Sequence, residues 1–187
     1  MTSREQPVFA VRAARDGDEA GISQVCREGF ARSSHGLLPP DVVRRQADHY
    51  YDVGRVRREI APHPRDPSWQ GYVVAVSPQG EVLGAAGGGV TEKQVGSVLV
   101  LYLDPRLRRR GIGTALLRHL TEQQRAVGAT EQWVTVTDGN VLGIPFYRAS
   151  GFVVRDRIPY VPADGGEPVG TSLRMSRSIR AVDPAQT

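Results

Sequence analysis

A run of arginines beside two glycines is the feature of this 187-residue chain with the clearest chemical potential. Arg108, Arg109 and Arg110 stand directly before Gly111 and Gly113, and an apolar pattern with helical spacing follows. The first N–H groups of a helix have no partner within it, and its N-terminus carries about half a positive charge. Glycines let such a backbone approach a phosphate closely, and arginines add forked donors. The segment therefore predicts a site for a phosphorylated ligand, with a solvated basic loop before a core helix as the alternative.

Two common phosphate-binding motifs do not fit this segment. The P-loop pattern needs a lysine after its second glycine, and the only lysine, Lys93, lies far from a suitable glycine pair. The dinucleotide-binding fingerprint needs a third glycine where this chain has Leu116. P-loop nucleotide hydrolases and dinucleotide-binding enzymes are therefore disfavoured.

The stretch LYLDPRLRRRGIGTALL resembles the acyl-CoA-binding motif of the GCN5-related N-acetyltransferase (GNAT) superfamily, R/Q-x-x-G-x-G/A after a central strand. A second stretch, NVLGIPFYRASGF at residues 140–152, is similar to the N-x-x-A-x-x-F-Y-x-x-x-G-F segment of the same superfamily. The usual alanine is Gly143 here. The two stretches occur in the expected order, and the resemblance covers about residues 70–180.

The resemblance implies acetyl-CoA as the acyl donor. The loop at residues 108–114 would hold the pyrophosphate, and the pantetheine arm would pair with the main chain of residues 101–103. The residues implied to bind acetyl-CoA are Leu101, Tyr102, Leu103, Arg108, Arg109, Arg110, Gly111, Ile112, Gly113, Thr114 and Asn140. The Leu103 N–H would polarise the thioester carbonyl. A valine at Gly113 is expected to block cofactor binding and to leave the fold mostly intact.

Two residues of the second stretch have competing interpretations. The resemblance implies that Tyr147 is the general acid, because a phenol stays protonated at neutral pH and can protonate the departing thiolate. Its alternative is simple packing of the Phe146–Tyr147 pair. Asn140 would orient the cofactor through its amide, or would act as an ordinary helix cap.

The general base is missing from the position where the resemblance would place it. Many GNAT members carry an acidic residue or a histidine on the central strand, and residues 98–103 contain neither. Glu92, Asp138 and His35 are alternatives without a spacing argument. We therefore expect deprotonation of the acceptor through ordered water, with no single carboxylate essential.

No metal site is predicted. The single cysteine, Cys26, lies on an apolar helical stripe and is expected to be a buried structural thiol, and the four histidines lack metal-ligand spacing. The glycine-rich stretch at residues 85–90 either leaves room for an acceptor or packs closely beneath a helix.

The apolar pattern and the turn residues predict an α+β domain. Strands are expected at residues 7–13, 98–103, 131–137, 152–157 and 171–179, with a hairpin over residues 69–91 that turns at 77–80. Helices are expected at residues 15–34, 42–60 with a break near Gly54, 111–127 and 141–150. The resemblance adds a mixed, mostly antiparallel sheet flanked by helices, with a splayed central strand pair. The expected domain spans residues 7–180 between tails 1–6 and 181–187, with a variable acceptor-side region at 33–62.

The composition limits the remaining function classes. A net charge of +4, almost all from arginine, is weak evidence for nucleic-acid binding, and stacking aromatics do not interleave with the arginines. No signal peptide or membrane span is visible, so a cytoplasmic location is expected. The leading interpretation is an N-acetyltransferase acting on a small-molecule amine. A protein acceptor, an acyl-CoA-binding domain without catalysis and a homodimer stay open.

Overall fold

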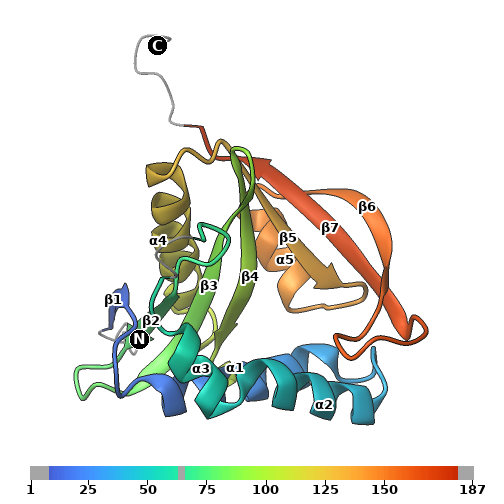
Figure 1. Ribbon diagram of the computed structural model, residues 1–187, viewed down its shortest axis with the longest axis horizontal. Coiled ribbons are helices and arrows are strands. Elements are labelled where there is room, and N and C mark those ends of the chain that lie inside the picture. The colour runs from blue at the N-terminus through green and yellow to red at the C-terminus, as the bar shows by residue number, and fades with distance from the viewer. Residues whose placement is uncertain (1–8, 63–65, 181–187) are drawn as a thin grey trace, which may run out of the picture.

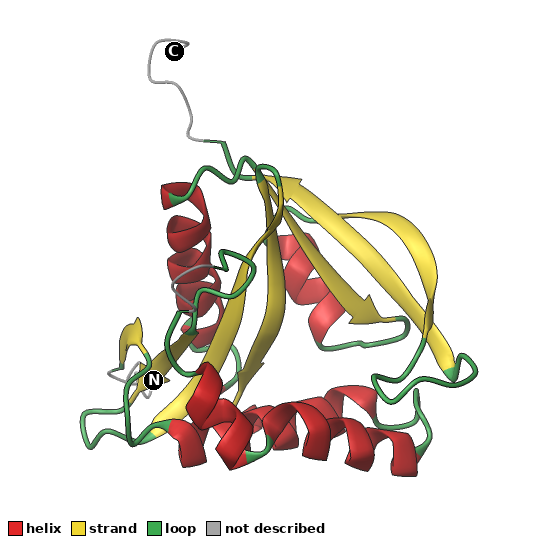
Figure 2. Ribbon diagram, viewed as in Figure 1, coloured by secondary structure: helices red, strands yellow, loops and turns green. Residues whose placement is uncertain are grey.

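A seven-stranded sheet organises the computed structural model, which describes residues 9–62 and 66–180 (Figures 1 and 2). The strands are β1 (Ala10–Ala13), β2 (Tyr72–Val76), β3 (Val82–Glu92), β4 (Val95–Leu103), β5 (Glu131–Thr137), β6 (Val153–Tyr160) and β7 (Gly170–Ser178). The helices are α1 (Glu19–Ser34), α2 (Pro40–Tyr51), α3 (Val53–Glu59), α4 (Ile112–Ala126) and α5 (Gly143–Ala149). The strand order is β1-β2-β3-β4-β5-β7-β6, and only β4 and β5 are parallel neighbours.

Helices cover both faces of the sheet, so its central strands are buried on both sides. All five residues of β2 are buried, which explains its uninterrupted apolar sequence. Tyr72 and Val74 pack with α1, α2 and α3, whereas Val73 and Ala75 pack with α4 and α5. This alternation follows from the two-residue period of a strand.

Most predicted elements are confirmed, and the differences are local. The predicted strand 131–137 coincides with β5, and the helix predicted at 111–127 is α4 within one residue of each end. The helical break predicted near Gly54 is confirmed. It falls at Asp52, whose side chain accepts a hydrogen bond from the Arg55 N–H at 3.1 Å and so caps α3, with Gly54 inside that helix. The predicted tails, and residues 7 and 8 of the first predicted strand, lie outside the described residues.

The parallel pair β4–β5 is short, and its two strands then separate. Pairing runs only from Val95 to Val98 on β4 and from Glu131 to Val134 on β5. Figure 1 shows the two strands together at one end and apart at the other. The expected splayed central pair is therefore present.

A β-bulge at Leu99 lies where the separation begins. Gly87 opposes Val100 and Gly88 opposes Val98, which leaves Leu99 as the extra residue on β4, 54% exposed. The extra residue reverses the side-chain alternation, so that Val98 packs on the α4 side and Val100 on the α1 side. The bulge thus re-aims the half of β4 that borders the gap.

Buried amides tie the closed end of the strand pair to α4. Gln124 donates to the carbonyls of Gly89 and Ser97 at 3.2 and 2.9 Å, and Gln132 of β5 donates to the Gln124 side-chain oxygen at 2.8 Å. Arg177 of β7 donates to Gln132 at 2.9 Å. Because these side chains satisfy one another, the closed end is held by polar bonds as well as by strand pairing.

The glycine-rich stretch of β3 is filled by protein. A Cβ at Gly87 would lie 2.4 Å from the Trp69 ring, and one at Gly88 would lie 2.0 Å from the Ser97 carbonyl oxygen. The hypothesis that these glycines leave room for an acceptor is therefore wrong, and close packing is the reason for them. Among the described residues, no helix is long and apolar enough to cross a membrane.

Candidate active site

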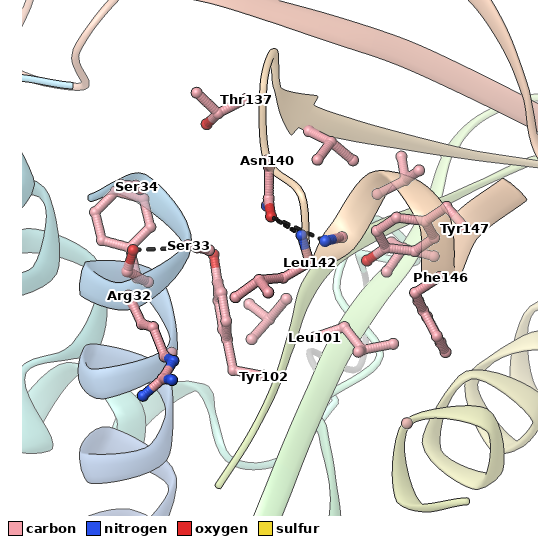
Figure 3. Close-up of a pocket in the computed structure, with 18 of the residues that line it drawn as sticks. Arg32, Ser33, Ser34, Leu101, Tyr102, Thr137, Asn140, Leu142, Phe146 and Tyr147 are labelled. Carbon is pink, nitrogen blue, oxygen red and sulfur yellow. Dashed lines mark hydrogen bonds between the residues drawn. The ribbon is translucent and has the colours of Figure 1, made fainter. Parts of the chain in front are cut away.

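A cavity of about 890 Å³ occupies the gap between β4 and β5. Its lining comes from α1, α2, the loop before α4, the start of α5 and the end of β6. Figure 3 shows residues of α1 on one side of this cleft and Asn140, Leu142 and Tyr147 on the other. Segments that lie more than a hundred residues apart in the sequence therefore share one site.

The backbone of β4 offers unpaired groups to this cleft. The Asp104 N–H donates to the Leu83 carbonyl of β3 at 2.9 Å, so these two residues form a hydrogen-bonded pair and the next pair, Gly84 and Leu103, is a non-bonded one. Because directly opposed antiparallel residues alternate between bonded and non-bonded pairs, Leu103 and Leu101 direct their N–H and C=O groups away from β3, toward the gap. The Tyr102 backbone faces β3, and only its side chain lines the cleft. Of the three residues predicted to pair with the pantetheine arm through their backbone, the geometry therefore favours Leu101 and Leu103.

The loop between β4 and α4 forms a cradle of free N–H groups. Gly111 is the N-cap of α4 with φ +83°, Arg109 has φ +60°, and no side chain caps the helix. Gly111, Ile112, Gly113 and Thr114 all line the cleft, so the uncapped helix start faces it. The helix start and the two left-handed residues make a concave, positively polarised backbone that suits an anion.

Positive charge gathers beside this cradle. Arg108 and Arg109 line the cleft, and so does Arg32 of α1. The pKa of Arg108 is lowered by partial burial and by the charges of Arg32 and Arg109. Within residues 9–62 and 66–180, none of the three has a hydrogen bond or ion pair to an acidic side chain, whereas Arg106 is paired with Asp104 at 2.6 Å. A ligand anion would relieve the repulsion.

Two predicted contacts are revised by the structure. Arg110 is exposed and is not among the residues that line the cleft. Gly113 lines the cleft with its backbone, but a Cβ there would lie 3.3 Å from both the Leu103 and the Phe146 side chains. That Gly113→Val blocks cofactor binding and leaves the fold mostly intact stays a prediction, and the added methyls would also press on this packing.

Asn140 acts as a helix cap in this structure. Its side-chain oxygen accepts from the N–H groups of Leu142 and Gly143 at 3.0 and 2.9 Å (Figure 3). A Cβ at position 143 would lie 2.9 Å from the Asn140 amide nitrogen, so Gly143 and the Asn140 side chain are closely packed. The capping alternative is thus confirmed, and a direct cofactor contact by Asn140 stays a prediction.

Tyr147 is held at the wall of the cleft by aromatic packing. Its ring makes edge contacts with Phe146 and Phe152 at centroid distances of 5.2 and 5.3 Å, and the residue is 7% exposed. In Figure 3 its hydroxyl points into the site on the side of Leu142. Burial raises the pKa of Tyr147 above the ordinary tyrosine value, so the phenol keeps its proton throughout the neutral range.

The described residues that line the cleft include no aspartate, glutamate or histidine. Asp138 faces Arg157, with which it forms an ion pair at 3.0 Å. Glu92 lies at the far end of β3, and His35 is exposed just after α1; neither lines the cleft. The three residues considered as bases are thus absent from it.

The region predicted to face the acceptor contributes four residues to the cleft, Ser33, Ser34, Gln46 and Tyr50. Gln46 is buried and accepts from the Ala163 N–H at 2.9 Å, which ties α2 to the β6–β7 loop. Arg32 of α1 and Tyr160 of β6 also line the cleft and were missed. No sequence signal marks them, because only the fold brings α1 and β6 to this gap.

Two further predictions concern Cys26 and metals. Cys26 is fully buried, and burial raises its thiol pKa, so the prediction of a structural thiol is confirmed. Across the described ranges, no group of three or more His, Cys, Asp and Glu side chains could hold a metal ion.

The fold and this splayed site define a GNAT acetyltransferase. The model of the acetyltransferase (GNAT) family matches residues 40–152, and the chain belongs to this family. A solved structure with a similar fold is that of the PaiA N-acetyltransferase of Thermoplasma acidophilum in complex with coenzyme A. The two share a TM-score of 0.76 and 19% sequence identity over 91% of this chain and 99% of that one. The protein is therefore an acyltransferase enzyme.

Characterised relatives acetylate small molecules. The chain is 32% identical to the L-methionine sulfoximine/L-methionine sulfone acetyltransferase of Pseudomonas aeruginosa, over 95% of this chain and 97% of that protein. It is 28% identical to the streptothricin acetyltransferase of Streptomyces lavendulae, over 81% of this chain and 85% of that protein.

Proposed function

We propose that this protein transfers the acetyl group of acetyl-CoA to a primary amine of a small molecule. The separation of β4 and β5 after Val98 carries this proposal, because it leaves the backbone groups of Leu101 and Leu103 unpaired in the cleft that Tyr147 also lines. The relatives named above, which act on small molecules, support the choice of acceptor class.

The residues present fit acetyl-CoA. The uncapped start of α4 and the side chains of Arg108 and Arg109 suit the pyrophosphate, since backbone N–H groups and arginine forks both donate to phosphate oxygens. The free N–H and C=O groups of Leu101 and Leu103 suit the amides of the pantetheine arm, which can pair like an extra strand.

The chemistry assigned to the chain is a direct transfer. The neutral amine attacks the thioester carbonyl, and the Leu103 N–H donates to the oxygen on which negative charge develops. As the C–N bond forms and the C–S bond breaks, Tyr147 donates its proton to the sulfur of the departing CoA. The proton lost by the amine returns to the phenol through water, because no acidic side chain or histidine among the described residues lines the cleft.

Calorimetric titration with CoA, combined with CoA release from acetyl-CoA over a panel of primary amines, tests the proposal. A double variant, Arg108→Gln with Arg109→Gln, should bind CoA at least about tenfold more weakly, given the strength of charged hydrogen bonds. Arg118→Gln is the matched control, because Arg118 is exposed on α4 and lies off the cleft. Equal CoA affinity of the double variant and the control contradicts the assignment of the loop.

Binding of acyl-CoA without catalysis is the outcome that would contradict the proposed transfer. Tight CoA binding without CoA release for any amine in the panel identifies this case. The proton donor Tyr147 at the cleft wall argues for the enzyme.

A further inference from the structure

The cleft has an uneven charge. Three arginines line it, Arg32, Arg108 and Arg109, and within the described parts of the chain no aspartate or glutamate does. An acceptor with several ammonium groups would leave water for a site whose described lining offers it no side chain of opposite charge. Carboxylates are the usual partners of such a polycation, because burying an unpaired charge is unfavourable.

One of the three arginines comes from outside the loop that is proposed to hold the pyrophosphate. Arg108 and Arg109 belong to the loop that leads into α4, whereas Arg32 reaches the cleft from α1 on the other side of β4 (Figure 3). Eight other arginines pair with acidic side chains, but Arg32 has no such partner within residues 9–62 and 66–180. Its charge already depresses the pKa of Arg108, so a bound anion beside it is favourable.

Beside Arg32, the cleft has polar lining from Ser33, Ser34 and Gln46, and it also exposes apolar and aromatic side chains. Leu99 is 54% exposed, Val161 is 51% exposed and Tyr50 is 38% exposed, although all three are large apolar side chains. Phe30 and Tyr160 add further ring surface to the lining. Exposed apolar side chains gathered at a cleft favour a ligand with an apolar body.

We propose that the acceptor is a small amine that carries a carboxylate of its own on an apolar body, as an α-amino acid with an apolar side chain does, and that Arg32 binds this carboxylate. The proposal rests on the acetyltransferase function above and deepens it. The reacting amine carries the only positive charge, and it loses that charge before attack.

Paired acceptors isolate the role of the carboxylate. CoA release is measured for L-α-amino acids with apolar side chains, for the carboxamide of each, and for linear polyamines. Each carboxamide keeps the side chain of the parent amino acid, and its amine is less basic. More of that amine is neutral near pH 7, so without the enzyme the carboxamide is the more reactive acceptor of the two. We nevertheless expect kcat/KM for the acids to exceed that of their amides at least about tenfold, and no turnover of polyamines.

A single variant locates the anion site. Arg32→Gln should raise KM for the amino acid about ten- to a hundredfold and leave KM for acetyl-CoA within about twofold. It should not weaken the binding of the amides. Arg44→Gln is the control, because it removes an exposed arginine of α2 that lies off the cleft. It should match the wild type in all these constants.

Each other outcome overturns the inference. Faster turnover of the amides or of polyamines, or no turnover of any amino acid, contradicts the acceptor class. A rise in KM for acetyl-CoA alone in Arg32→Gln assigns Arg32 to a CoA phosphate. If acetyl-CoA binds and some other amine is acetylated, this inference fails and the acetyltransferase function stands; if no amine releases CoA, the proposed function fails as well.

Discussion

Replacing Tyr147 by phenylalanine removes one hydroxyl and keeps the ring that packs against Phe146 and Phe152. Both ring contacts are edge contacts between carbon frameworks, at 5.2 and 5.3 Å between centroids, so the variant retains them. The hydroxyl has no hydrogen bond to another described residue, so its removal leaves no buried polar group without a hydrogen-bond partner. The free energy of unfolding should therefore change by less than about 1 kcal/mol.

The effect on catalysis should be far larger. Loss of a positioned general acid typically lowers the rate by about 10² to 10⁴, which corresponds to about 3 to 5 kcal/mol of activation free energy. We expect kcat to fall by that factor and the affinity for acetyl-CoA to change little, because the ring stays in place. Steady-state CoA release and calorimetric titration measure the two quantities separately.

Tyr72→Phe is the matched control. Tyr72 is buried, also has a raised pKa, and lies off the cleft, so its variant should keep the wild-type kcat. Wild-type turnover in Tyr147→Phe refutes the assignment, since the thiolate would then depart unaided or another group would protonate it. A loss of kcat in both variants would point to a general effect of removing a buried hydroxyl.

The raised pKa of Tyr147 also fixes the sign of the alkaline response. The phenol acts in its protonated form, so its contribution is present below its pKa and is lost as pH rises through it. Because burial raises the pKa of Tyr147 above the ordinary value of about 10, activity should persist through that pH. An alkaline loss of activity centred well below this value, and absent from Tyr147→Phe, contradicts the burial argument.

Three further predictions concern the base, the loop and the cap. With no acidic side chain or histidine among the described residues that line the cleft, the rise of kcat/KM with pH should follow the pKa of the acceptor amine. Two acceptors whose pKa values differ by about two units should give two separate profiles, and a common profile for both would reveal a side-chain base. Gly113→Val should lower the free energy of unfolding by about 1 to 3 kcal/mol in denaturant titrations, because the added methyls meet Leu103 and Phe146; wild-type stability with lost CoA binding would support the simple steric interpretation. Asn140→Ala should cost about 1 kcal/mol of unfolding free energy by uncapping α5, and an unchanged denaturation midpoint would show that the cap contributes nothing.

Local features of the site could be predicted from the sequence because they depend on neighbouring residues. The loop before α4 needs only the left-handed conformation of Gly111 and an uncapped helix start, and both lie within a few residues of Arg108. Strand β5 shows the same independence, since its alternating sequence WVTV specifies one buried face wherever the strand is placed.

The separation of β4 from β5 depends on tertiary structure. No pattern within residues 95–103 predicts that pairing stops at Val98. The end of the pairing depends on the bulge at Leu99 and on the hydrogen bonds that the Gln124 side chain makes at the closed end. The family resemblance implied the separation, but the residues that produce it became visible only when α4, β3 and β5 were brought together.

The sequence by itself determined the family, the arginine- and glycine-rich loop that is proposed to hold a phosphate, and the lack of an acidic residue on the central strand. Only the tertiary structure decided that Gly113 packs against protein, that Asp138 turns to Arg157, and that Arg32 enters the cleft. The physical reason is the range of the interactions. Caps, turns and strand alternation act between residues a few positions apart, whereas the charge and shape of the cleft arise from side chains of segments that lie far apart in the sequence.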